Sequence, residues 1–135
     1  MRSIWLLPIA LVASVLFTAG AQAAERTRAE AECRPTDKNL VYDCLIMLTG
    51  KNSGALMDDV EFTVRANMPS MPMAHNVKPI KAIPTGKQGM YRARIELEMH
   101  GEWVLKMDIS RPAGDTIIYK MRFGASGGAG VSGSN

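Results

Sequence analysis

The fold is decided by residues 91–109, YRARIELEMHGEWVLKMDI. Apolar and polar side chains alternate through 91–99 and again through 103–109, which is the period of a half-buried β-strand. The apolar set comprises Tyr91, Ala93, Ile95, Leu97, Met99, Trp103, Leu105, Met107 and Ile109. His100-Gly101 stands between the two runs, and glycine accepts the positive φ of a tight connection without strain. The sequence therefore predicts a β-hairpin with one face in a hydrophobic core.

Further candidate strands lie on both sides of this hairpin. They cover residues 40–48, 58–65, 76–83 and 116–123, and turn-forming clusters separate them. Six or seven short strands without a convincing amphipathic helix predict an all-β fold, a small immunoglobulin-like antiparallel β-sandwich. The term immunoglobulin-like refers to architecture only. Trp103 follows both cysteines, whereas the tryptophan of antibody domains stands between them.

The N-terminus is typical of a secretory signal peptide. Arg2 precedes an almost wholly apolar run over 4–17, and Ala21-Gln22-Ala23 forms a cleavage site. The apolar run is shorter than the ~20 residues that a spanning helix needs, and an uncleaved anchor is the alternative. We therefore expect residues 1–23 to be removed. The protein is then periplasmic or otherwise exported, with no membrane span after cleavage.

The remaining chain divides into three parts. Residues 24–39 form an N-terminal segment tied by Cys33, and its polar first half (24–31) is expected to be loose or briefly helical. Residues 40–123 form the β-sandwich domain. Residues 124–135 form a Gly/Ser tail, which has too little apolar surface to bury and is expected to be disordered.

The two cysteines of the chain are Cys33 and Cys44. An even pair behind an export signal predicts one disulfide, which would tie the N-terminal segment onto the first strand of the domain. The alternative is a dithiol site for a metal or for redox chemistry. The pair lacks the C-x-x-C spacing that is typical of such sites.

The segment Met68-Pro69-Ser70-Met71-Pro72-Met73-Ala74-His75 carries three thioethers and one imidazole. Soft sulfur ligands select soft ions, Cu(I) above all, and imidazole joins them readily. The prolines keep the segment out of a helix and off a central strand, where a metal could reach it. We predict a Cu(I) site here. The alternative is that the methionines fill the end of the core, because the chain contains 10 of them.

The alternating direction of consecutive strands adds one residue to this candidate site. If consecutive strands reverse direction, the connection at 68–75 and the connection at His100-Gly101 lie at the same pole of the sandwich. His100 is therefore a candidate to complete the metal site. The alternative is a plain turn residue, because histidine tolerates the left-handed conformation better than most residues.

Other functional classes find less support in the sequence. Removal of Arg2 leaves 15 of the 16 basic residues against 13 acidic ones, a balance of +2, which is too near neutral to indicate nucleic-acid binding. The sequence shows no Ser-His-Asp arrangement, zinc-protease motif or phosphate-binding loop. Glu96 and Glu98 lie beside Arg92 and Arg94, which is typical of a solvated charge ladder. The sequence therefore predicts a protein that is not an enzyme.

Three stretches together resemble the YtkA-like and FixH-like families of bacterial envelope proteins. They are residues 68–75, Gly89-Met90-Tyr91 and residues 97–103, and the resemblance covers about residues 40–123. It implies a small immunoglobulin-like β-sandwich outside the cytoplasmic membrane that is associated with copper or heavy-metal traffic. By this resemblance, Gly101 and Trp103 match the hairpin of the family. The residues that match its Met/His loop are Met68, Met71, Met73 and His75.

These observations lead to one functional expectation and one rival. The expectation is an exported protein that binds Cu(I) through Met71, Met73 and His75, completed by Met68 or His100, and hands it to a partner. The partner would be an envelope metal-transport or oxidase-assembly protein. The rival is a module without metal that serves such a system through protein contacts, with the Met/Pro loop as an adaptable apolar surface.

Overall fold

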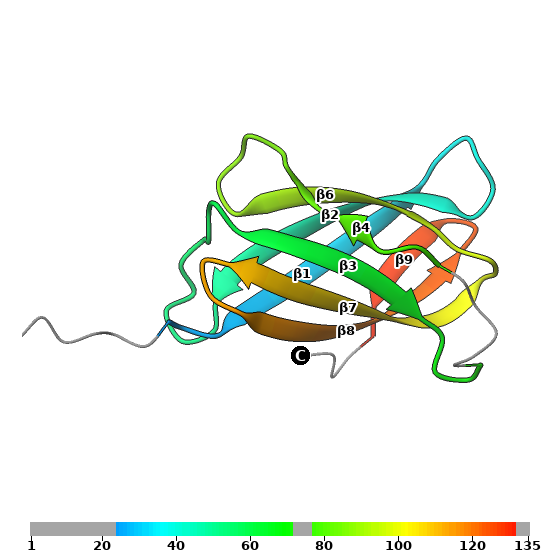
Figure 1. Ribbon diagram of the computed structural model, residues 1–135. Coiled ribbons are helices and arrows are strands. Elements are labelled where there is room, and N and C mark those ends of the chain that lie inside the picture. The colour runs from blue at the N-terminus through cyan, green and yellow to red at the C-terminus, as the bar shows by residue number, and fades with distance from the viewer. Residues whose placement is uncertain (1–23, 72–76, 132–135) are drawn as a thin grey trace, which may run out of the picture.

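The computed structural model describes residues 24–71 and 77–131, and these are folded as β-strands and connections without any helix (Figure 1). All strand pairs are antiparallel, which confirms the all-β prediction. The nine strands are β1 (Thr27–Pro35), β2 (Val41–Gly50), β3 (Glu61–Asn67), β4 (Ile80–Lys81), β5 (Ile83–Pro84), β6 (Met90–Glu96), β7 (Gly101–Arg111), β8 (Asp115–Gly124) and β9 (Gly127–Gly130).

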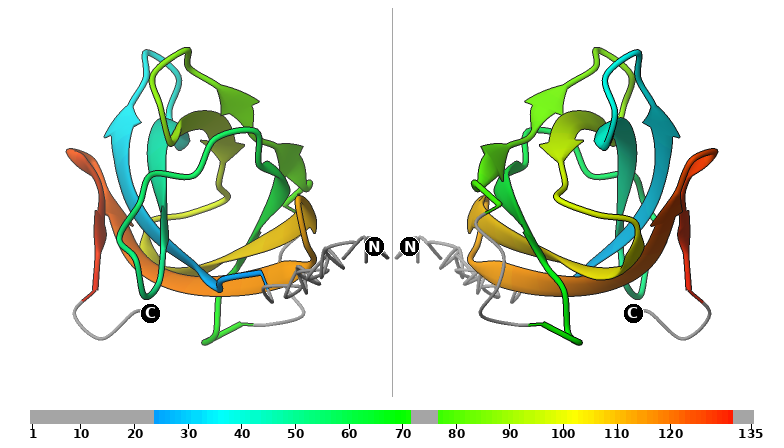
Figure 2. Two further views of the ribbon diagram at one scale, coloured as in Figure 1. Left: turned by 90° about the vertical axis from the view of Figure 1, so that its left-hand side faces the viewer. Right: turned by 90° about the vertical axis from the view of Figure 1, so that its right-hand side faces the viewer.

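The strands form one sheet in the order β4-β3-β7-β8-β9-β1-β2-β6-β5. The two edge strands, β4 and β5, are separated only by Ala82, whose N–H donates to the Phe62 carbonyl at 3.1 Å. One extended segment therefore pairs with β3 on one side and with β6 on the other. The sheet curls into a nearly closed, barrel-like sandwich around a single core, as the end-on views show (Figure 2).

The predicted hairpin of residues 91–109 is wrong in its pairing. β6 pairs with β2 and β5, and β7 pairs with β3 and β8, so the two strands lie on opposite sides of the core (Figure 1). Alternation determines which face of a strand is buried, but both a hairpin and an arch across the core satisfy it. Gly101 nevertheless adopts the positive φ expected for this connection, at +138°.

The N-terminal segment is also more ordered than predicted. Residues 27–35 form β1 instead of a loose or helical segment, and they pair with β2 from Thr27 opposite Gly50 to Pro35 opposite Tyr42. Ala29 and Cys33 are buried, while the charged residues between them are exposed. Alanine and glutamate favour strands weakly, and here the complete ladder with β2 overrides that preference.

The Gly/Ser tail contains the ninth strand, contrary to the expectation of disorder. β9 lies between β8 and β1, with Gly128 opposite both Phe123 and Cys33. A Cβ atom at Gly128 would approach the Phe123 ring to 2.6 Å and the Cys33 Cβ to 3.2 Å, so only glycine fits. The tail contributes backbone hydrogen bonds where a side chain would be excluded. Residues 132–135 lie outside the described part of the chain.

The core combines aromatic and aliphatic side chains from nearly every strand. Trp103, Leu105 and Met107 of β7 are completely buried, and they belong to the same core cluster as Tyr91 and Ile95 of β6. The hydroxyls of two buried tyrosines, Tyr42 and Tyr91, have hydrogen-bond partners. The Tyr91 hydroxyl donates to the Met57 carbonyl at 2.8 Å and accepts from the Val60 N–H at 3.0 Å, which holds the β2–β3 connection. These hydrogen bonds satisfy the polar ends of two large aromatic side chains of the core.

Candidate functional site

The candidate metal site lies at one pole of the sandwich, which we call the methionine pole. It is formed by the connections at 36–40, 68–71, 97–100 and 125–126. The end of β3 pairs with the start of β7, with Asn67 opposite Val104, so the segment after β3 meets the segment before β7. A Cβ atom at Gly101 would lie 3.2 Å from the Met68 Cε. The connections that the parity argument places together are therefore adjacent.

The predicted ligands differ in their accessibility. Met68 is only 4% exposed and belongs to the hydrophobic core, so for this residue the packing interpretation is correct. The backbone turns back after it, because the Met71 N–H donates to the Met68 carbonyl at 3.1 Å. Met71, in contrast, is 38% exposed. Met73 and His75 lie outside the described residues.

The connection between β6 and β7 adds further donors to the methionine pole. His100 is exposed, and Met99 is 38% exposed, although alternation assigned Met99 to the core. Strand β6 ends at Glu96, so alternation no longer governs residue 99. The indole Nε1–H of Trp103 donates to the Met99 carbonyl at 3.1 Å, and the ring itself is completely buried. Trp103 therefore holds the 97–100 connection against the core.

The donor chemistry of this pole is that of a thioether and imidazole site. Among the residues that the structure describes, no group of three or more His, Cys, Asp or Glu side chains could hold a metal ion. Both cysteines are engaged in the predicted disulfide, with Cys33 directly opposite Cys44 in the β1–β2 ladder. The exposed soft donors of the described pole are thus Met71 and Met99, beside the imidazole of His100.

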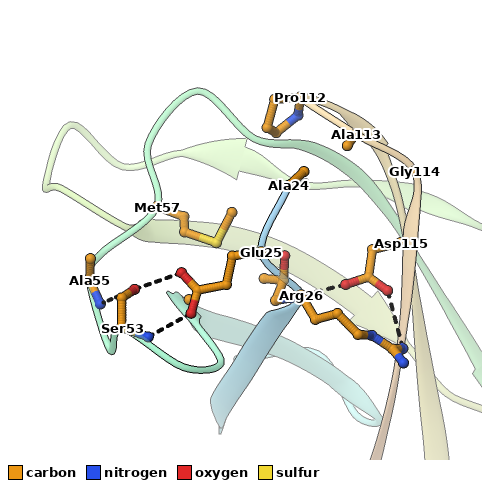
Figure 3. A pocket seen from close by; sticks show the side chains of 12 residues that line it. Ala24, Glu25, Arg26, Ser53, Ala55, Met57, Pro112, Ala113, Gly114 and Asp115 are labelled. Carbon is orange, nitrogen blue, oxygen red and sulfur yellow. Dashed lines mark hydrogen bonds and ion pairs between the residues drawn. The ribbon is translucent and has the colours of Figure 1, made fainter. Parts of the chain in front are cut away.

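The opposite pole carries a cavity that the sequence did not reveal. It has a volume of about 510 Å³ and lies where the N-terminal segment passes between the 50–57 connection and the 112–115 turn (Figure 3). The Glu25 carboxylate accepts from the Ser53 hydroxyl at 2.7 Å and from the Ser53 N–H at 2.5 Å. Arg26 pairs with Asp115 at 3.3 Å. These residues are far apart in sequence, and no motif indicated that they meet.

The two carboxylates in this cavity hold the N-terminal segment in place. Hydrogen bonds from the Ser53 hydroxyl and N–H, with a further one from the Asn52 N–H, lower the pKa of Glu25 below its ordinary value and outweigh the opposing effect of desolvation. Burial raises the pKa of Asp115, but hydrogen bonds from the N–H groups of Thr27 and Thr116 and the charge of Arg26 outweigh it. The pKa of Asp115 is therefore lowered as well. Both groups are engaged in structure and not free for acid–base chemistry.

Acidification is expected to release the N-terminal segment before the core unfolds. Both pKa values are lowered in the folded state, so these contacts stabilise the segment above the unfolded pKa values of about 4, and the stability is lost as the pH falls through the lowered values. Amide-exchange protection of Thr27 and Asn52 should fall at acid pH while that of Leu105 persists. Glu25→Gln should loosen Asn52 already at neutral pH, and equal protection of Thr27 and Leu105 throughout would contradict the expectation.

Comparisons with protein-family models, with curated proteins and with solved structures found no match to this chain. The resemblance to the YtkA-like and FixH-like families therefore stays a prediction from the sequence motifs. A search of the described residues for a long apolar helix that could cross a membrane found none.

Proposed function

We propose that this protein is an exported domain that binds Cu(I) at the methionine pole and passes it to a partner protein. The observation that carries the proposal is the gathering of exposed Met71, Met99 and His100 at one pole. Met73 and His75, the other proposed ligands, follow Met71 in the sequence. The disulfide supports an exported location, because disulfides persist in oxidising compartments.

The burial of Met68 refines the proposed ligand set. A core methionine whose Cε lies against Gly101 cannot offer its sulfur to solvent without leaving the core. We therefore favour His100 over Met68 as the residue that completes the set of Met71, Met73 and His75. Long unbranched methionine side chains can converge without a fixed backbone, and a site at an exposed pole suits exchange with a partner better than storage.

A Cu(I) competition titration tests the proposal. The protein exported from its full-length gene is titrated under anaerobic conditions against a chromophoric Cu(I) chelator. We expect near one-to-one binding, and the triple replacement Met71→Ala, Met73→Ala, His75→Ala should weaken it by more than about a hundredfold. The matched control is Met121→Leu, which changes a buried methionine and should leave the affinity unchanged. An unaltered affinity in the triple variant would contradict the proposal.

Two single variants separate the candidates for the completing ligand. His100→Ala should weaken Cu(I) binding, whereas Met68→Leu should preserve it, because leucine fills the same buried space. The opposite pattern would assign the role to Met68. The partner we propose for the handover is an envelope metal-transport or oxidase-assembly protein.

The rival function is protein binding without metal. The exposed side chains of Met71 and Met99 would serve it as an adaptable apolar contact. Capture of an envelope partner that persists in the presence of a Cu(I) chelator, together with no competition in the titration, would favour this rival.

A further inference from the structure

A groove of about 920 Å³ runs along the outside of β6, and we call it the β6 groove. Its floor is formed by β6 and the residues that follow it, 92–98. One wall is the start of β2 with the preceding turn, and the other is the segment 77–83. The groove ends next to the 97–100 connection, so it borders the methionine pole. It does not depend on any residue of the proposed metal site.

The backbone of β6 is open on the side that faces the 77–83 segment. β5 pairs with β6 only at Tyr91 and Arg92, and within the described chain no other strand pairs with this edge of β6 over residues 93–96. Both backbone groups of Met90 bond to the 85–87 turn, on the same side as β5. Because these groups alternate sides along a strand, Arg94 and Glu96 present their N–H and C=O toward the groove. A strand edge of this kind accepts an extended peptide.

The charges around the groove select what can bind there. Five cations line it against three carboxylates. Four of the cations make no ion pair with any described residue, namely Lys38, Lys78, Lys81 and Arg92. The fifth, Arg94, is held by Asp43 at 2.7 Å. A second copy of this edge would bring the same cations together, so the charge opposes self-pairing and favours an acidic strand.

The groove also offers apolar contacts between the cations. Ile83, which lines the groove, is 57% exposed and lies beside Arg92 in the sheet. Ile80 and Val77 are partly buried along the wall. A bound strand would therefore bind most tightly if acidic and apolar side chains alternated along it. One face of the strand would then meet the cations and the other face the apolar side chains.

We propose that the β6 groove binds an acidic, extended segment of a partner protein, which adds a short strand to the open edge of β6. Acidic side chains of the segment meet Lys78, Lys81 and Arg92, and its backbone bonds to Arg94 and Glu96. About four residues of the segment pair with β6, since the open edge runs from 93 to 96. A partner held here is delivered next to the methionine pole, whether or not that pole binds metal.

Fluorescence anisotropy tests the proposal on the protein exported from its full-length gene. The probe is a labelled peptide of about eight alternating valine and glutamate residues, long enough to span the open edge. We expect saturable binding that weakens about tenfold in Lys78→Glu/Lys81→Glu, because two favourable ion pairs become repulsive. The matched control, Lys87→Glu/Lys120→Glu, makes the same charge change outside the groove and should bind as the unchanged protein does.

Two further probes separate strand addition from a purely ionic attraction. The same peptide methylated on alternate backbone nitrogens keeps its charges but loses donors, and its binding should weaken by at least about tenfold. Amide NMR signals of Arg94 and Glu96 should shift with the unmodified peptide. The proposal is overturned if the groove and control variants lose affinity equally, or if methylation has no effect. Binding of anionic phosphatidylglycerol vesicles through Lys78 and Lys81 without peptide binding would also overturn it.

Discussion

Replacement of Trp103 by alanine is expected to lower the free energy of unfolding by about 3–5 kcal/mol. The side chain is completely buried at the start of β7, where it closes the core beneath the methionine pole. Removal leaves a large cavity, and it also removes the indole N–H that holds the Met99 carbonyl. Such a loss is a large share of the stability of a small domain, typically about 5–15 kcal/mol. Urea unfolding followed by circular dichroism measures it.

Two further substitutions show which part of this effect is packing. Trp103→Phe keeps most of the apolar contact but loses the hydrogen bond to Met99, so it should cost about 1–3 kcal/mol. Met99→Ala changes a partly exposed side chain and should stay within about 0.5 kcal/mol. If Trp103→Ala cost no more than Met99→Ala, the burial of the ring would not contribute to stability as the structure requires.

Loss of the disulfide is expected to lower the free energy of unfolding by about 3 kcal/mol. The bond joins Cys33 and Cys44, which are 11 residues apart, and the closed loop limits the freedom of the unfolded chain. It also pins the centre of β1, and β1 supports β9 through the pairing of Cys33 with Gly128. Strands β1 and β9 therefore depend on this bond more than β7 does.

The double replacement Cys33→Ala/Cys44→Ala measures this contribution, and the urea midpoint is the readout. The unchanged protein should fall to nearly the same midpoint when a reductant is added, whereas the double variant should not respond to it. Amide exchange should locate the loosening in β1 and β9. A reductant-independent midpoint for the unchanged protein would contradict the expectation.

Alternation along residues 91–109 predicted the buried side chains of β6 and β7 well. Tyr91, Ala93, Ile95, Trp103 and Leu105 are all buried. The same pattern failed to identify the neighbours of either strand, because a half-buried strand has the same sequence wherever it lies around the core. The error at Met99 has a related cause, since alternation ends where the strand leaves the sheet, at Glu96.

The candidate metal site was predictable only in part. Strand parity correctly placed Met68 beside the 100–101 connection, because alternating direction needs no knowledge of partners. It could not distinguish the buried Met68 from the exposed Met71. The β6 groove and the cavity around Glu25 had no motif at all, since each is assembled from segments that are distant in sequence.

The sequence by itself determined the all-β class, the disulfide and most of the core, because hydrophobic period and cysteine count are local properties of the chain. Only the tertiary structure decided that β6 and β7 face each other across the core. It also decided that a glycine-rich tail becomes β9 between Phe123 and Cys33. The physical reason is that backbone hydrogen bonds are the same for every residue except proline. Which strands pair therefore depends on how the whole sheet closes around the core and on where a strand with small side chains fits. No single segment of the sequence encodes either property.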